Sequence, residues 1–298
     1  MPDLTGASAG PHQAQEIFAG SFRRVAFFGG VYSNYLALAA AYDLARALRV
    51  DSVFALGDFG AFGPHPDRTL DFLREGNIPC LQGNYEEALS DAAEDCRCGY
   101  TDPRDNHYAR LSFDYTSART SAHHKDWMRA LPRHLRMTLG DTRVLCCHGS
   151  PRRINEFLWA SSTSDAFLRK LLDDHETDLL ICTHTGLHWS RFLKNGKGPA
   201  RGIVNVGALG RPANDGRTEV WFAIVETAGS AAGCAAGTGP GSGGIKVEFV
   251  PVPYDHARLA REMEAEGLPP EFRETILTGW WTTCLEILPA KERAAGKF

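Results

Sequence analysis

Residues 52–64 read SVFALGDFGAFGP, a short apolar run followed at once by an aspartate within a glycine-rich turn. Residues 143–151 repeat the arrangement and read RVLCCHGSP. Apolar runs of this kind, bounded by turn-forming residues, are typical of buried β-strands. Each predicted strand is therefore followed directly by a side chain that can bind a metal, Asp58 in the first case and His148 in the second.

Similar apolar runs recur through the first two thirds of the chain, and segments with helical periodicity separate several of them. This alternation predicts an α/β sandwich. The predicted strands cover residues 25–28, 52–56, 78–81, 143–147, 179–182 and 203–206. Helices are predicted from Ser33 or Asn34 to about residue 49, after Pro66, and over 122–131, 164–174 and 253–267.

Composition excludes several classes of function. The 298 residues are 43% hydrophobic, which is enough for a large core, and the formal net charge is −4. This charge argues against the broad basic face that binds nucleic-acid polymers or anionic membranes, whereas a small anionic substrate needs only a local positive site. No apolar run reaches the roughly 18 residues of a membrane-spanning helix, and no secretory signal is evident. We expect a soluble cytoplasmic protein.

The domain organisation is predicted to be simple. Residues 1–20 form a loose leader, and residues 21–298 form a single domain. Within it, 91–114 is an insertion, either a lid or a solvated loop, and 227–244 is a flexible loop rich in Gly, Ala and Ser. Residues 253–298 form a helical extension.

A tryptophan pair and the cysteines also allow predictions about packing and disulfide bonds. The pair Trp280 and Trp281 either packs the extension on the domain or forms a partner surface, so a homo-oligomer stays open. Cys96 and Cys98 are too close in sequence for an easy mutual bridge. Four other cysteines stand in apolar surroundings and are predicted to be reduced core residues, namely Cys80, Cys146, Cys147 and Cys182.

Two further polar residues follow predicted strands. Asn84 comes after residues 78–81, and His184 comes after residues 179–182. Carboxyl ends of strands converge along one edge of an open α/β sheet, so we expect these side chains to meet Asp58 and His148 there. One carboxylate, one amide oxygen and two imidazoles suit zinc, manganese or iron.

The order of these blocks resembles that of bacterial metallophosphoesterases, members of the calcineurin-like phosphoesterase superfamily. The resemblance extends to residues 57–64 and 205–212, which are similar to blocks of the diadenosine-tetraphosphatase-like and phosphodiesterase-like branch. It covers roughly residues 24–226 and implies a four-layer αββα sandwich. The matching blocks are Leu56-Gly57-Asp58, Gly83-Asn84, His148-Gly149-Ser150-Pro151 and Thr183-His184-Thr185.

Departures from the family pattern fall on one of its two metals. The family opens with Asp-x-His-x-Asn, whereas residues 30–34 read GVYSN, so Gly30 and Tyr32 replace two ligands. The family's Gly-His-x-His block keeps His184, but Gly186 replaces its second histidine. The resemblance implies that the other metal set is complete, and that set comprises Asp58, Asn84, His148 and His184. We therefore predict one divalent transition metal, Mn, Fe or Zn.

The predicted function is that of a mononuclear metal-dependent hydrolase, which uses metal-activated water on a small phosphate ester or nucleotide-like substrate. Tyr85 replaces the histidine that usually acts near the leaving group, and it is a candidate to position substrate or donate a proton together with Tyr32 and His188. Asn34 and Arg211 are candidate substrate contacts.

Two alternatives stay open. One is a catalytically silent relative that binds a ligand or a partner in the same cleft. The other is a nonhaem iron enzyme, because Asp58, His148 and His184 provide the two-histidine, one-carboxylate set that such enzymes use.

Overall fold

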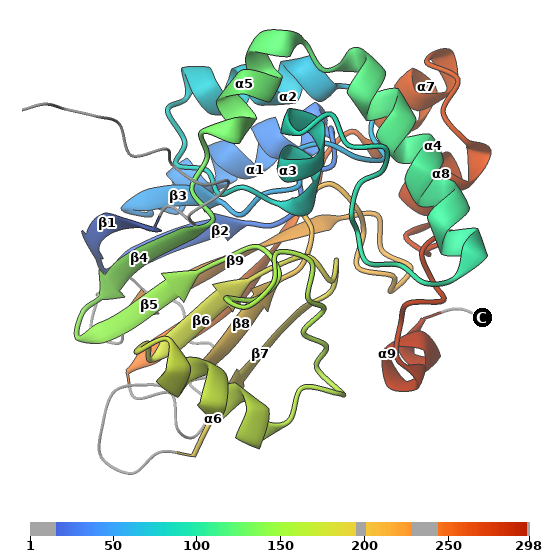
Figure 1. The fold of residues 1–298 in the computed structure, drawn as a ribbon. Coiled ribbons are helices and arrows are strands. Elements are labelled where there is room, and N and C mark those ends of the chain that lie inside the picture. Colours follow the sequence, from blue (N-terminus) through green and yellow to red (C-terminus); the bar gives the residue numbers. More distant parts are fainter. Residues whose placement is uncertain (1–15, 195–200, 228–243, 297–298) are drawn as a thin grey trace, which may run out of the picture.

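The computed structural model describes residues 16–194, 201–227 and 244–296. Within these ranges the chain forms two β-sheets packed face to face (Figure 1). One sheet has six strands in the order β1-β4-β5-β6-β8-β7, and the other has four in the order β10-β9-β2-β3. The strands are β1 (Glu16–Phe22), β2 (Arg24–Phe28), β3 (Ser52–Ala55), β4 (His134–Leu139), β5 (Thr142–Cys146), β6 (Leu179–Cys182), β7 (His188–Phe192), β8 (Gly202–Val206), β9 (Val220–Thr227) and β10 (Ile245–Val252).

Helices cover the outer faces of both sheets (Figure 1). Helices α1 to α5 pack on the four-stranded sheet, and α6 packs on the six-stranded sheet. This gives the predicted αββα order of layers. The helices are α1 (Tyr35–Ala47), α2 (Pro66–Glu75), α3 (Asn84–Ser90), α4 (Pro103–Arg119), α5 (Ala122–Arg129), α6 (Asp165–Asp174), α7 (His256–Ala265), α8 (Pro270–Thr278) and α9 (Ala290–Ala295).

The central strand β2 shows why the predicted strands read as continuous apolar runs. Successive side chains of a strand point to opposite faces. Val25 and Phe27 enter the core between the two sheets, whereas Ala26 and Phe28 enter the core beneath the helices. Both faces of the strand are buried, so polar residues do not alternate with apolar ones.

Two segments differ from the predicted strands. Residues 78–81 form no strand and contribute only a bridge between Cys80 and Ala55, because the chain turns there toward α3. Residues 16–20, assigned above to the loose leader, begin β1, which pairs in parallel with β4. This edge strand is largely exposed, so it lacks the apolar pattern of the others. Residues 1–15 and most of the predicted loop 227–244 lie outside the described residues.

The insertion 91–114 is not simply a solvated loop. Its second half belongs to α4, which begins at Pro103 and buries Ala109 and Phe113. Polar residues dominate the exposed side of this helix, and they obscure its apolar side in the sequence. The first half contains a disulfide between Cys96 and Cys98, contrary to the expectation that they stand too close to bridge.

The backbone explains that bridge, because Arg97 lies between the two cysteines in a left-handed conformation with φ 51°. This turn brings the Cα atoms of Cys96 and Cys98 to 5.2 Å, within the range that disulfides span. The four predicted core cysteines are free and buried, as expected.

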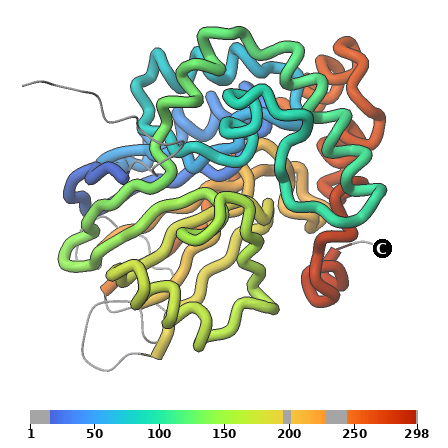
Figure 2. The backbone as a smooth tube through the Cα atoms, viewed as in Figure 1, coloured from blue at the N-terminus to red at the C-terminus, as the bar shows by residue number. Residues whose placement is uncertain are grey.

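The C-terminal extension runs along one side of the domain and returns to the insertion, as the tube in Figure 2 shows. The Asp105 carboxylate at the start of α4 accepts hydrogen bonds from the backbone N–H groups of Leu285 (3.1 Å) and Ile287 (2.9 Å). The extension is thereby tied to the insertion. No helix among the described residues is long and apolar enough to cross a membrane.

Candidate functional site

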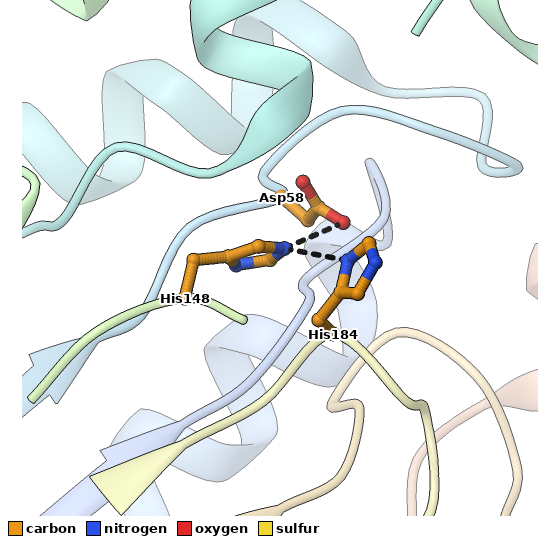
Figure 3. Close-up of side chains that lie close together, drawn as sticks. All are labelled: Asp58, His148 and His184. Carbon is orange, nitrogen blue, oxygen red and sulfur yellow. Dashed lines mark hydrogen bonds and ion pairs between the residues drawn. The ribbon is translucent and has the colours of Figure 1, made fainter. Parts of the chain in front are cut away.

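Three of the four predicted ligands meet where strands of the two sheets end (Figure 3). Asp58, His148 and His184 follow β3, β5 and β6, and one ligand atom of each lies within 4.8 Å of the others. All three residues are buried. Asp58 and His184 hold left-handed backbone conformations, with φ 58° and 68°, which are uncommon outside glycine and cluster at functional sites.

The hydrogen bonds of His148 fix its tautomer. Its Nδ1 lies 2.7 Å from the carbonyl oxygen of Leu56, which can only accept, so Nδ1 carries a proton and donates it. Nε2 then faces the Asp58 carboxylate at 3.3 Å and Nδ1 of His184 at 3.1 Å (Figure 3). In the neutral imidazole this arrangement turns the Nε2 lone pair toward the Asp58 carboxylate, which also can only accept. A cation between the two would satisfy both.

The electrostatics of the three groups follow from burial and mutual contact. Burial, followed by the charge of His148, lowers the pKa of His184 to about 3, so this imidazole is neutral. Burial opposes ionisation of Asp58 and of His148, but their attraction dominates: the pKa of Asp58 is lowered and that of His148 is raised. The pocket therefore favours a charged carboxylate beside a positive charge.

The fourth predicted ligand, Asn84, is the first residue of α3 and is fully buried. Its neighbour Tyr85 donates its backbone N–H to Oδ1 of Asp58 at 3.2 Å. Oδ1 of Asn84 is buried without a hydrogen-bond partner, which is costly unless another group binds it. As a donor set, this orphaned amide oxygen together with the carboxylate and the two imidazoles fits a divalent transition metal.

A further residue of the site, Glu86, has no counterpart in the sequence prediction. Its carboxylate accepts hydrogen bonds from the backbone N–H groups of Asp58, Phe59 and Gly83, each at 2.8 Å. Burial and the nearby charge of Asp58 raise the pKa of Glu86 to about 7. Glu86 fastens the turn that carries Asp58 to the turn that carries Asn84. The only sequence signal is its place two residues after Asn84.

Aromatic rings pack against the two glycines at which the resemblance implies lost ligands. A Cβ atom added to Gly30 would lie 2.5 Å from the ring of Tyr32, which folds back over this glycine. A Cβ atom added to Gly186 would lie 2.8 Å from the ring of Trp281, which comes from the C-terminal extension. The space directly beside each of these two glycines is thus occupied by an aromatic ring of this chain. Trp281 is buried, in agreement with the packing alternative for the tryptophan pair.

A small cavity adjoins the cluster on the side of the insertion. Tyr32, Tyr85 and Tyr100 line it, together with Cys98 and the Asp58 and His184 side chains. Burial raises the pKa of all three tyrosines, so their hydroxyls stay protonated. The Tyr85 hydroxyl lies 2.9 Å from Oγ of Ser112 in α4.

The remaining predicted residues are placed differently. Asn34 caps α1: its Oδ1 accepts from Ala37 N–H at 3.0 Å, and its Nδ2 donates to Gly210 O at 3.1 Å, so its amide serves the backbone. His188 does not join the cluster, because its ring packs against Trp221 and Phe249, with centroids at 4.8 and 4.6 Å.

Arg211 is buried beside the filled position. Its guanidinium stacks 4.1 Å from the centre of the Trp281 ring and donates to the carbonyl oxygen of Thr283 at 2.7 Å. Its expected role as a substrate contact stays a prediction.

Comparison with known proteins agrees with this geometry. The profile of the calcineurin-like phosphoesterase superfamily domain matches residues 24–230. A metallophosphoesterase from Sphaerobacter thermophilus is 26% identical; the match covers 87% of this chain and 99% of that one, with a TM-score of 0.62. A hypothetical protein from Pyrococcus horikoshii has 18% identity with the same coverage and a TM-score of 0.67. An uncharacterized protein from Methanocaldococcus jannaschii is 20% identical over 267 residues, which is 86% of this chain and 98% of the relative.

Proposed function

The chain belongs to the calcineurin-like phosphoesterase superfamily, and on that premise we propose that it hydrolyses a small phosphate ester or nucleotide-like compound with a single divalent metal. One observation carries the proposal. The four residues of one metal set survive, and three of them converge, whereas Tyr32 and Trp281 fill the positions of the other set. Ligands are missing from one metal set only, whereas a chain that no longer binds metal would be expected to lose ligands from both sets. This pattern favours a working mononuclear site.

Asp58, Asn84, His148 and His184 would hold the metal. When bound, a divalent ion supplies Lewis acidity toward a phosphoryl oxygen and lowers the pKa of a coordinated water. The chain prepares these ligands beforehand: the Leu56 carbonyl orients the His148 imidazole, and Glu86 fixes the turns of Asp58 and Asn84. Such outer contacts hold a ligand set in place and tune it.

The tyrosines of the cavity would handle the substrate. With their pKa values raised by burial, Tyr32 and Tyr85 offer neutral O–H groups that can donate hydrogen bonds to phosphate or leaving-group oxygens. Replacing the family's histidine by Tyr85 also removes a charged proton donor. We therefore expect substrates with good leaving groups to be hydrolysed faster than alkyl esters.

Metal stoichiometry tests the proposal. We would measure Mn, Fe and Zn per chain by plasma mass spectrometry on protein purified without chelator, in the wild type, in His148→Ala and in His65→Ala. His65 is half-buried at the start of α2, where its Nε2 lies 2.9 Å from a Glu262 carboxylate oxygen, outside the groups of possible metal ligands among the described residues. We expect about one ion per chain in the wild type and in His65→Ala, and loss in His148→Ala. Two ions per chain would refute the mononuclear site, and none after reconstitution would refute the metal site.

Turnover is then measured with the stoichiometric metal. Phosphomonoesters and phosphodiesters with nitrophenyl leaving groups, and nucleotides, form the panel, with Tyr85→Phe as the test of the tyrosine. Saturable binding of these compounds without turnover would favour the silent binding protein. Oxygen consumption that depends on iron(II) would favour the nonhaem iron alternative.

A further inference from the structure

The Cys96–Cys98 disulfide lies against one of the proposed metal ligands. The side-chain nitrogen of Asn84 donates to the carbonyl oxygen of Cys96 at 2.8 Å and contacts Sγ of Cys98 at 3.4 Å. Cys98 also lines the cavity that Asp58 and His184 share. Because Asn84 is fully buried, these contacts take the place of water around its NH₂ group.

These contacts determine which way the Asn84 amide faces. A carbonyl oxygen only accepts hydrogen bonds, so the NH₂ group and not Oδ1 must point toward Cys96. The flipped amide would set two oxygens against each other in a buried site. With the NH₂ group held there, Oδ1 is the atom left without a partner. The cysteine turn thus presents the amide oxygen for another ligand.

We propose that the Cys96–Cys98 disulfide positions the Asn84 amide for metal binding, so that the metal affinity of the site depends on the redox state of this pair. This inference rests on the proposed metal site. The two cysteines act through Asn84 as positioning residues and are not themselves ligands.

Reduction would disturb the turn for a steric reason. Two unbonded thiol sulfurs cannot approach closer than van der Waals contact, so the sulfurs separate once their bond breaks. The turn is fastened at its middle residue, because Arg97 forms an ion pair with Asp91 (2.8 Å) and its carbonyl oxygen accepts from Asn155 at 3.0 Å. The displacement therefore falls on the two cysteines, whose carbonyl oxygen and sulfur contact the Asn84 amide. Losing the outer partner of a metal ligand typically weakens metal binding by about 10–100-fold.

The pair can be addressed selectively. Among the described residues the other cysteines are buried free thiols, which react slowly. Cys234 lies outside the described residues, so a full-length Cys234→Ser protein is the starting material. A water-soluble trialkylphosphine is the reductant: it takes up oxygen from water as the S–S bond breaks, giving two thiols and the phosphine oxide. Unlike a dithiol, it does not chelate the metal strongly.

The experiment compares Mn²⁺ affinity in the oxidised and reduced protein, with free Mn²⁺ measured by electron paramagnetic resonance after the phosphine is removed under argon. Thiol titration confirms the redox state. We expect reduction to weaken Mn²⁺ binding about 10–100-fold and air reoxidation to restore it. Cys96→Ser/Cys98→Ser should bind like the reduced protein and ignore the phosphine, whereas Cys80→Ser should respond like the parent. Thermal unfolding checks that each variant is folded.

Asn84→Ala separates positioning from general damage. If the disulfide acts through this amide, Asn84→Ala binds Mn²⁺ weakly, and reduction changes its affinity no further. An undiminished redox effect in Asn84→Ala would overturn the inference, as would equal parent affinities in both states. Tighter binding after reduction, with thiolate-to-metal charge transfer in the Co²⁺ spectrum, would make Cys98 a ligand and also overturn it. Failure of the oxidised parent to bind any metal would instead reject the proposed function.

Discussion

Adding one methyl group at Gly186 should reveal how firmly Trp281 fills the lost ligand position. In Gly186→Ala the new Cβ would lie 2.8 Å from Cη2 and 3.0 Å from Cζ2 of the indole ring. The ring is held in place, because Nε1 donates to Pro212 O at 2.7 Å and the Trp281 backbone N–H donates to Asn214 Oδ1 at 2.8 Å. Relief of the contact must therefore come from shifts of the surrounding structure.

Gly267→Ala is a matched control. Both glycines have left-handed backbones, with φ 74° at Gly186 and 70° at Gly267, but a Cβ at Gly267 meets nothing within 4 Å. Each variant loses roughly 1–2 kcal/mol from the unfavourable φ. About 0.4–1 kcal/mol is regained because alanine restricts the unfolded chain. Gly186→Ala suffers in addition the overpacking of a filled site, typically about 1–3 kcal/mol. We expect it to be the less stable variant by that difference.

Urea titrations give the free energy of unfolding of both variants, and the dependence of this free energy on urea concentration should be the same in each. The double variant Gly186→Ala/Trp281→Leu replaces the ring by a smaller side chain. It should lose roughly 0.5–3 kcal/mol less stability than the two single substitutions do in sum. Equal losses for Gly186→Ala and Gly267→Ala, together with additive behaviour of the double variant, would refute the placement of Trp281.

Three further outcomes are expected. Glu86→Gln keeps the shape of the side chain but removes one acceptor for backbone N–H groups. We expect the free energy of unfolding in urea titrations to fall by roughly 1–3 kcal/mol, and metal binding measured by calorimetry to weaken. Burial opposes ionisation of Asp178, yet hydrogen bonds from Arg143 hold the pKa of this carboxyl below its usual value. The stabilisation that the carboxylate provides is therefore present above the unfolded pKa of ~3.9, and it is lost as pH falls through the folded pKa. The free energy of unfolding of Asp178→Asn should accordingly fall less steeply with acid than that of the wild type. Asn34→Ala should lower the free energy of unfolding by about 1 kcal/mol, because the α1 cap is lost, and should leave the phosphate affinity measured by calorimetry unchanged. A large loss of phosphate affinity would instead support Asn34 as a substrate contact.

The meeting of Asp58, His148 and His184 could be predicted because local pattern and topology both specify it. Asp58, His148 and His184 each end a short apolar run, and strand ends of packed sheets meet at one edge. The prediction needed no knowledge of loop paths. His188 shows the limit of such reasoning, since two residues beyond a ligand turn it already belongs to β7, and its ring packs on the neighbouring sheet.

The covering of Gly186 by Trp281 could not be predicted in the same way. Gly186 and Trp281 are far apart in the sequence, and no periodicity relates a tryptophan after α8 to a glycine after β6. The Cys96–Cys98 bridge depends on a left-handed residue between the cysteines, and Glu86 acts through backbone N–H groups that carry no side-chain signal. The types of side chain along the sequence predict strand ends and helix caps. Packing between distant segments, and contacts made by backbone N–H groups, are known only from the three-dimensional structure.

The placement of Trp281 also makes the C-terminal extension a movable wall of the ligand cluster. The indole is held through Pro212 and Asn214, and not through the strand ends that carry the cluster. Local opening of the extension, with both sheets still folded, would therefore uncover Gly186 and admit small solutes from that side.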